Sequence, residues 1–211
     1  MLNVSSLRCV RGDRCLFKDV GFSLQDGELL HLHGHNGSGK TTLMRTLAGL
    51  GQPAEGEIRW QDELIGELDE EYTRHVLYIG HKNAIKDDLT AVENLLTSSL
   101  LDGFETPTRD AWQALAKMGL KGFEDLPSKV LSQGQKRRVA LSRLLTTKTR
   151  LWILDEPFVA LDKAAVAYLQ DIIREHVANG GMVILTTHQE VELTSGTVKQ
   201  LQLGWKKADH V

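Results

Sequence analysis

Short apolar runs separated by amphipathic stretches indicate alternating strands and helices. The runs with the length of buried strands are residues 29–33, 76–79, 151–154 and 182–185. After Asp162, apolar residues recur at helical spacing as far as Val177, and Asn179-Gly180-Gly181 marks the end of that helix. This alternation predicts an α/β domain built on a mostly parallel sheet flanked by helices.

The N-terminal residues follow a different pattern. Residues 2–10 and 15–24 form strand-like runs, separated and followed by turn signals at Gly12-Asp13 and Asp26-Gly27. We expect an antiparallel β part that lies beside the loop of residues 34–42, which is discussed below. Residues 57–60 form another strand-like run, followed by a polar turn.

Residues 82–131 lack strand-like runs and carry helical ones. Thr90 and Glu93 have the spacing of a capping box, and a second amphipathic stretch over residues 109–118 is closed by Gly119. We expect a helical subdomain inserted between strands of the main sheet. The whole chain, residues 1–211, is then a single domain with this insertion at about residues 82–131.

Composition narrows the class of protein. The chain has 211 residues, a formal charge of −3 and 41% hydrophobic residues, which suits one buried core and gives no basic footprint for nucleic acid. No apolar run approaches the ~20 residues that span a bilayer, and the charged N-terminus does not resemble a signal peptide. Cys9 and Cys15 lack metal-ligand spacing, so reduced thiols are expected. We therefore expect a cytosolic protein, or one held on a membrane by something else.

Residues 34–42, Gly-His-Asn-Gly-Ser-Gly-Lys-Thr-Thr, complete the phosphate-loop pattern G-x-x-x-x-G-K-[ST] between an expected strand and an expected helix. In that setting, backbone N–H groups and a helix N-terminus point at a phosphate, which a chance glycine-rich turn would not achieve. Lys40 is expected on the β- and γ-phosphates of a nucleoside triphosphate, and the Thr41 hydroxyl on Mg²⁺. The candidate nucleotide-binding residues here are Gly34, His35, Asn36, Gly37, Ser38, Gly39, Lys40, Thr41 and Thr42.

Two acidic residues and a histidine follow two of the buried runs. Asp155 and Glu156 come directly after residues 151–154, and His188 follows residues 182–187. Open α/β sheets bind ligands at the carboxyl ends of their strands. Asp155 suits Mg²⁺, Glu156 suits the orientation or deprotonation of an attacking water, and His188 suits contact with the γ-phosphate. An acidic surface turn and an ordinary surface histidine are the alternatives, so these assignments depend on the phosphate loop.

Ser132-Gln133-Gly134-Gln135 has the form of a second capping box at the head of another expected helix. Its N–H groups and the Ser132 hydroxyl offer a second anion site. Because one chain needs only one triphosphate cradle, this segment is expected to serve the nucleotide of another copy. Plain helix capping is the alternative that the segment favours when it is taken alone.

The order of these segments resembles the ABC-type ATPase family over residues 2–190. The matching segments are residues 34–42, 131–135, 151–156, 159–162 and His188, which correspond to that family's Walker A, signature, Walker B, D-loop and switch-histidine segments. The resemblance implies a P-loop NTPase fold of ABC type that hydrolyses ATP with Mg²⁺. It further implies catalytic roles for Lys40, Glu156 and His188, with Thr41 and Asp155 on the metal.

The same resemblance implies a head-to-tail homodimer in which the signature segment acts in trans. The residues of that segment are Ser132, Gln133, Gly134 and Gln135. Gln133 departs from the family's usual glycine. His81 stands where the family has a metal-binding glutamine, and because a histidine nitrogen is a poor Mg²⁺ ligand it acts through water or couples the site to the helical subdomain. Arg11 replaces the aromatic residue that stacks on adenine, and its guanidinium plane can also stack.

Local matches resemble one subfamily, the ATP-binding subunits of bacterial cytochrome c maturation, also called haem exporter ATP-binding proteins. They are Gly80-His81, Leu89-Thr90, Glu93-Asn94-Leu95, residues 151–158 and residues 185–189. The resemblance implies integral membrane subunits of the same transporter as partners, a peripheral position on the cytoplasmic face of the inner membrane, and work in haem export or in the release of a haem-loaded chaperone. His31, His33 and His35 suggest haem or metal binding, but C-x-x-C-H is absent and no direct haem binding is expected.

Other functions stay open beside this one. The chain can be the energising subunit of another small-cassette ABC exporter. A soluble ABC-type ATPase acting on nucleic acid or ribosomes is less favoured, because the chain has one cassette, no heptad run and no basic patch. A stand-alone kinase would leave residues 131–135 without a role.

Overall fold

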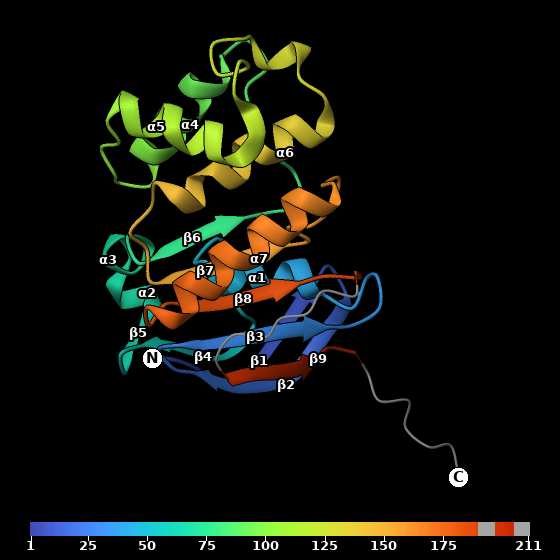
Figure 1. Cartoon of the computed structure of the whole chain (residues 1–211). Helices are drawn as coiled ribbons and strands as arrows, with labels where there is room; N and C mark the ends of the chain where they lie inside the picture. The colour runs from blue at the N-terminus through green and yellow to red at the C-terminus, as the bar shows by residue number, and fades with distance from the viewer. Residues whose placement is uncertain (190–196, 205–211) are drawn as a thin grey trace.

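Two sheets and a group of helices make up the structure, a computed structural model that describes residues 1–189 and 197–204 (Figure 1). The larger sheet has the strand order β6 (Val76–Ile79), β7 (Leu151–Asp155), β8 (Met182–Thr186), β3 (Glu28–His33) and β9 (Thr197–Gln202). Its neighbouring strands pair in parallel. The mostly parallel sheet predicted from the sequence is confirmed, although β9 was not expected.

The smaller sheet is antiparallel, as predicted for the N-terminal residues. Its strand order is β2 (Arg14–Leu24), β1 (Leu2–Arg11), β4 (Glu55–Trp60) and β5 (Glu63–Leu64). Where the sequence indicated only a polar turn after residue 60, the chain forms β5 and the single-turn helices α2 (Ile65–Leu68) and α3 (Glu70–Thr73). Elements this short show no measurable hydrophobic period, which is why the sequence did not reveal them.

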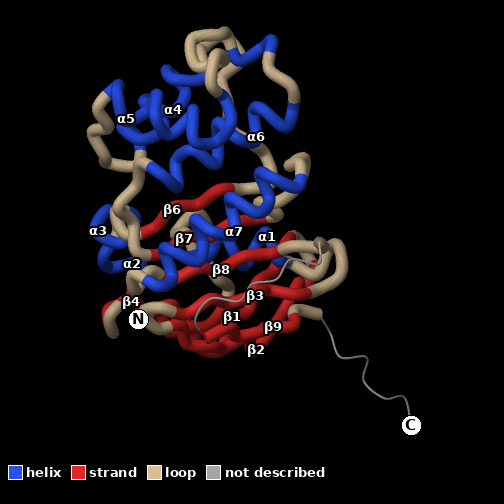
Figure 2. Tube along the Cα trace, viewed as in Figure 1, coloured by secondary structure: helices blue, strands red, loops and turns tan. Residues whose placement is uncertain are grey.

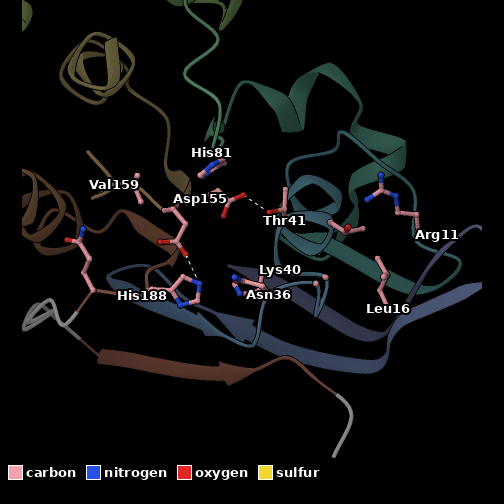
Figure 3. A pocket seen from close by; sticks show the side chains of 14 residues that line it. Arg11, Leu16, Asn36, Lys40, Thr41, His81, Asp155, Val159 and His188 are labelled. Carbon is pink, nitrogen blue, oxygen red and sulfur yellow. Dashed lines mark hydrogen bonds and ion pairs between the residues drawn. The ribbon is translucent and has the colours of Figure 1, made fainter. Parts of the chain in front are cut away.

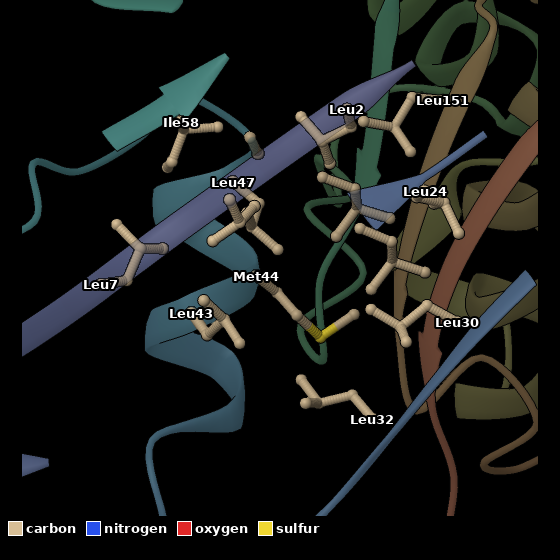
Figure 4. Packing of buried hydrophobic residues seen from close by; sticks show 14 of the residues in the cluster. Leu2, Leu7, Leu24, Leu30, Leu32, Leu43, Met44, Leu47, Ile58 and Leu151 are labelled. Atoms are coloured by element: carbon tan, nitrogen blue, oxygen red, sulfur yellow. The ribbon is translucent and has the colours of Figure 1, made fainter. Parts of the chain in front are cut away.

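Helix α1 (Lys40–Leu47) packs against residues of both sheets (Figure 4). Leu43, Met44 and Leu47 have no exposed surface, and burial of a side chain of this size contributes about 1.5–3 kcal/mol. Their neighbours in the same core include Leu2, Leu7, Leu24, Leu30, Leu32 and Ile58. This packing fixes the start of α1, and therefore the loop before it, relative to the whole fold.

Helix α7 (Lys163–Ala178) covers the other face of the larger sheet. Its buried residues Leu169, Ile173 and Val177 share a core with Trp152 and Leu154 of β7, whereas Leu151 and Ile153 of the same strand belong to the core around α1. The strand is therefore buried on both faces, which explains its unbroken apolar run. The helix begins after Asp162, as the sequence predicted, and Asp162 caps it by accepting a 2.8 Å hydrogen bond from the backbone N–H of Ala165.

Between β6 and β7 in the sequence come α4 (Ala91–Leu101), α5 (Thr108–Leu115) and α6 (Gln133–Leu141), which lie together beyond the β6 edge of the larger sheet in Figure 2. Shorter helical turns cover Ala116–Leu120, Ser128–Val130 and Ser142–Leu145. The predicted capping box of Thr90 and Glu93 is formed, and Gly119 ends its segment at a φ of 77° that favours glycine. The division into one domain with an inserted helical subdomain stays a prediction.

Candidate nucleotide site

The phosphate loop joins the end of β3 to the start of α1, and its shape depends on glycine at two positions. At Gly34 the φ is 154°, and a Cβ would lie 2.5 Å from Ser38 Oγ and 2.6 Å from the backbone oxygen of Leu203. At Gly39 the φ is 99°, and a Cβ would lie 2.9 Å from the ring of Phe17. Any side chain at either position would force the loop away from the two sheets.

Lys40 holds its ammonium group inside this loop. Its Nζ donates hydrogen bonds to the backbone oxygens of Gly34, at 2.6 Å, and His35, at 3.3 Å. The two carbonyl oxygens thus accept N–H groups of Lys40 that a phosphate oxygen could accept instead, because an ammonium group only donates hydrogen bonds. The lysine predicted to bind phosphates is already oriented toward the centre of the loop.

A chain of hydroxyl and carboxylate groups connects α1 to the ends of β7 and β8. The Thr41 hydroxyl donates to Asp155 Oδ2 at 2.7 Å, and the Thr186 hydroxyl donates to Asp155 Oδ1 at 2.8 Å. The oxygen of Thr186 also accepts from the backbone N–H of Glu156 at 3.0 Å. Thr186 is fully buried and fixes both acidic residues, a role that its position in an apolar strand did not reveal.

Glu156 lies at the turn after β7 with a φ of 51°, in the left-handed region that non-glycine residues rarely adopt. Its side chain is 14% exposed, and among the described residues its Oε1 atom has no hydrogen-bond partner. His188 Nε2 lies 3.4 Å from this atom, at ion-pair distance when the imidazole is protonated but without hydrogen-bond geometry (Figure 3). A carboxylate oxygen held near a histidine, with a lone pair to spare, is equipped to accept a proton.

These groups surround one cavity of about 580 Å³. Of the predicted site residues, the cavity is lined by Arg11, Asn36, Gly37, Gly39, Lys40, Thr41, Thr42, His81, Asp155, Glu156 and His188. Gly34, His35 and Ser38 support the loop without lining it; Ser38 is 3% exposed. Figure 3 shows Arg11 and Leu16 at one end, and His188 and Val159 at the other.

Three lining residues were not among the predicted ones. Leu16, on β2, Val159, after β7, and Gln189, after β8, all face the cavity. Leu16 belongs to a strand-like run whose alternation gave no sign of a ligand. Val159 and Gln189 lie within segments that the family resemblance included, and that resemblance was the only signal for them.

The predicted second anion site lies in a different cavity, of about 400 Å³. Its lining residues are Gly119, Ser132, Gly134, Gln135, Arg138, Ala160 and Asp162; Gln133 is not one of them. The capping box is formed: Ser132 Oγ accepts from the Gln135 N–H at 3.2 Å, and Gln135 Oε1 accepts from the Ser132 N–H at 2.9 Å. The two cavities share no lining residue in the described part of the chain.

Comparison with known proteins defines the class. The family model described as ABC transporter matches residues 17–159, and the chain therefore belongs to the ABC transporter family. A solved structure described as an ATP-binding subunit of an ABC transporter has a TM-score of 0.80 at 28% identity, covering 89% of this chain and 79% of its own. A dimeric bacterial ABC transporter cassette has a TM-score of 0.84 at 23% identity, covering 97% and 95%.

Two relatives are much more similar in sequence. Each is described as a cytochrome c biogenesis ATP-binding export protein, CcmA. The protein from Nitrosospira multiformis is 53% identical over 93% of this chain and 96% of its own length. The protein from Dechloromonas aromatica is 53% identical over 97% of this chain and all of its own.

Membership of this family gives the chain its general activity. It binds nucleotide and hydrolyses ATP, and ABC cassettes work as dimers together with membrane subunits. In the ranges that the structure describes, no helix is both long and apolar enough to cross a bilayer.

Proposed function

We propose that this chain is the ATP-hydrolysing subunit of a membrane ABC-type complex in cytochrome c biogenesis, acting in haem export or in the release of a haem-loaded chaperone. The observation that carries the proposal is the 53% identity to two cytochrome c biogenesis relatives over almost the full length of both chains. The subunit of another small-cassette exporter, with the same ATPase chemistry, is the second candidate.

Lys40, Thr41 and Asp155 bind the triphosphate and its metal in this proposal. The Thr41 hydroxyl and the Asp155 carboxylate are hard oxygen ligands of the kind that Mg²⁺ prefers, and their oxygens already lie 2.7 Å apart. The residues therefore fit the ion, which when bound neutralises charge on the phosphates during transfer. Lys40 contributes a second positive charge to the β- and γ-phosphates, and the N–H groups of the loop surround them.

Glu156 acts as the general base in this proposal. It accepts a proton from the water that attacks the γ-phosphorus, while the bond to the leaving ADP oxygen breaks and phosphate is released. The free Oε1 atom of Glu156 supports this role, and the nearby His188 imidazole donates to the γ-phosphate. His81, exposed on the cavity wall, acts through water, and Arg11 stacks on the base.

The proposal includes a head-to-tail homodimer. In it Ser132, Gln133, Gly134 and Gln135 approach the γ-phosphate that another copy holds. Separation of the Ser132 cavity from the Lys40 cavity supports this arrangement, because neither cavity of one copy contains both sets of groups. Closing and opening of this dimer drives the membrane subunits.

The proposed partners are integral membrane subunits of the same transporter, and the proposed location is peripheral, on the cytoplasmic face of the inner membrane. No nucleic acid is expected as a partner, given the net charge of −3. Nor do we expect direct haem binding. Titration of the purified protein with haem tests this last point: a stoichiometric, histidine-dependent absorption spectrum would contradict it.

A complementation experiment tests the proposed pathway. The chain is expressed in a bacterium that lacks its own cytochrome c biogenesis ATP-binding export protein, and covalently bound haem in c-type cytochromes is measured. Native protein is expected to restore the signal and Glu156→Gln to leave it at background. Co-purification from detergent extract should recover a polytopic membrane protein. If the chain hydrolyses ATP but restores no c-type cytochromes, the result favours a subunit of another small-cassette ABC exporter. Co-sedimentation with ribosomes would favour a soluble ABC-type ATPase.

A further inference from the structure

Arg137 is a buried charged residue that the reaction described above does not use. It lies on α6, five positions after Ser132, and only 3% of its surface is exposed. Arginine is rarely buried to this extent without a carboxylate partner. Yet in the described part of the chain no carboxylate forms an ion pair with Arg137.

Its guanidinium group instead donates hydrogen bonds to neutral oxygens on two separate loops. Nη2 reaches the backbone oxygens of Asp155, at 3.1 Å, and Glu156, at 2.9 Å, and Nε reaches that of Pro157 at 3.4 Å. Nη1 reaches the backbone oxygen of Gly80, at 2.9 Å, and Asn83 Oδ1, at 3.3 Å. One side chain thus joins α6 to the turn after β7 and to the loop after β6.

The first of these loops carries the proposed general base. Glu156 adopts a φ of 51°, and such a backbone persists only where surrounding contacts fix it. Thr186 holds its N–H, and Arg137 holds its carbonyl oxygen. The second loop carries His81, on the wall of the same cavity.

The chemistry of arginine suits this task. A planar guanidinium presents five N–H donors in a fixed fork, whereas lysine has three donors on a flexible stem. Burial lowers the pKa of Arg137 below its ordinary value, and the charges of Asp155 and Glu156 oppose part of that shift. A guanidinium nevertheless stays protonated in a protein, so all its N–H donors remain in place. If filling space were the only need, an apolar side chain would avoid the cost of burying a charge.

We propose that Arg137 is a positioning residue for ATP hydrolysis: it fixes the turn of Glu156 and the loop of His81 to the helix that begins with the signature segment. Displacement of α6 is then transmitted through one rigid group to the general base. The inference depends on the proposed role of Glu156, which the Glu156→Gln variant tests by itself.

The test compares Arg137→Lys with Arg143→Lys in the full-length protein. Arg143 also makes a multidentate, largely buried contact, to Asp102, but both residues belong to the helical part and Arg143 does not line the cavity of Glu156. We expect Arg137→Lys to lower kcat about tenfold or more, because small displacements of a catalytic group have large effects, with ATP Kd unchanged. Arg143→Lys should lower the melting temperature but leave kcat within about twofold.

A second variant and a double mutant keep the inference testable if Arg137→Lys does not fold. Asn83→Ala removes one acceptor of the guanidinium, and we expect kcat to fall about two- to threefold at unchanged ATP Kd. In the Glu156→Gln background, neither change should lower the residual rate further, because both act through the same group. A native kcat in folded Arg137→Lys overturns the inference. If Arg137→Lys is unfolded, a native kcat in Asn83→Ala overturns it. Near-native turnover in Glu156→Gln overturns the assignment of the general base instead.

Discussion

The two cavities of this molecule differ in what they bring to a phosphate. The cavity at the phosphate loop has a lysine, two threonine hydroxyls and two carboxylates, together with glycines of the loop itself. The cavity at the head of α6 has a helix N-terminus and the Ser132 hydroxyl, and its arginine, Arg138, is already paired with Asp162 at 2.5 Å. In the proposed mechanism the first cavity therefore holds the triphosphate and the groups for its hydrolysis, whereas the second adds only neutral hydrogen-bond donors.

This difference explains why the sequence of residues 132–135, considered alone, indicates helix capping rather than an anion site. Its capping box satisfies the N–H groups of Ser132 and Gln135, which leaves those of Gln133 and Gly134 for an external anion. A few neutral N–H groups are too weak to hold a triphosphate by themselves. They suit the proposed task of completing a site that another copy has already filled.

The largest effect is expected for Glu156→Gln, which should stop hydrolysis in the first cavity without weakening ATP binding. Glu156→Gln keeps the shape of the side chain but removes the proton acceptor, so kcat should fall about 100-fold or more. ATP affinity should stay within about twofold, and an ATP-bound dimer should accumulate in size-exclusion chromatography with light scattering. Glu71→Gln, an exposed change on α3, serves as the control. Hydrolysis at near-native rates would remove Glu156 from its role.

Lys40→Ala tests binding in the same cavity. It removes the proposed charge-assisted contact to phosphate. A contact of this kind contributes about 1.5–3 kcal/mol, so ATP Kd should rise about 10- to 100-fold. Titration with a fluorescent ATP analogue measures the change. Lys199→Ala, which removes the ion pair to Glu28 on the neighbouring strand, should bind ATP as the native chain does. An unchanged ATP Kd in Lys40→Ala would contradict the proposed binding of the phosphates by Lys40.

The helix starts, the phosphate loop and the parallel strands around the two cavities could be predicted from the sequence, because local patterns specify local structure. The capping boxes that begin at Thr90 and Ser132 each require only two residues three positions apart, in which each side chain accepts from the other residue's backbone N–H, and both are formed. The phosphate loop is similarly local. Parallel pairing followed from the apolar runs, since a strand buried on both faces such as β7 has no polar side to show.

The contacts that the sequence did not reveal all join distant segments. Thr186 organises Asp155 and Glu156 from the next strand, 31 and 30 positions along the chain respectively. Arg137 looks like any charged residue on a helix until the turn after β7 is packed against it. Strand β9 has exposed and partly exposed residues along its whole length, so only its pairing with β3 defines it. Register and tertiary packing, rather than residue type, determine these three.

Gly134→Ala addresses the second cavity. A Cβ at this position would lie 2.7 Å from the backbone oxygen of Ala160, so the two segments that line the cavity must separate. We expect ATP-dependent dimerisation and hydrolysis to fall about tenfold, while ATP binding by one copy is unchanged, because Gly134 does not line the first cavity and the phosphate loop is not displaced. Gly66→Ala, where a Cβ meets nothing within 4 Å, is the matched control. Weakened ATP binding in Gly134→Ala would show that the two cavities are not independent.

Ser132→Ala, which has the smallest expected effect, tests whether the second cavity contributes a hydroxyl to ATP hydrolysis. It removes the cap of α6, at a cost of about 1 kcal/mol in stability, together with a hydroxyl donor to the proposed anion. Thr90→Ala removes the equivalent capping box of α4, outside both cavities. Equal losses of melting temperature are expected, but only Ser132→Ala should lower ATP hydrolysis, by about two- to fivefold. Equal hydrolysis in the two variants would mean that Ser132 only caps its helix, and that any contact with a second copy's nucleotide depends on backbone N–H groups alone.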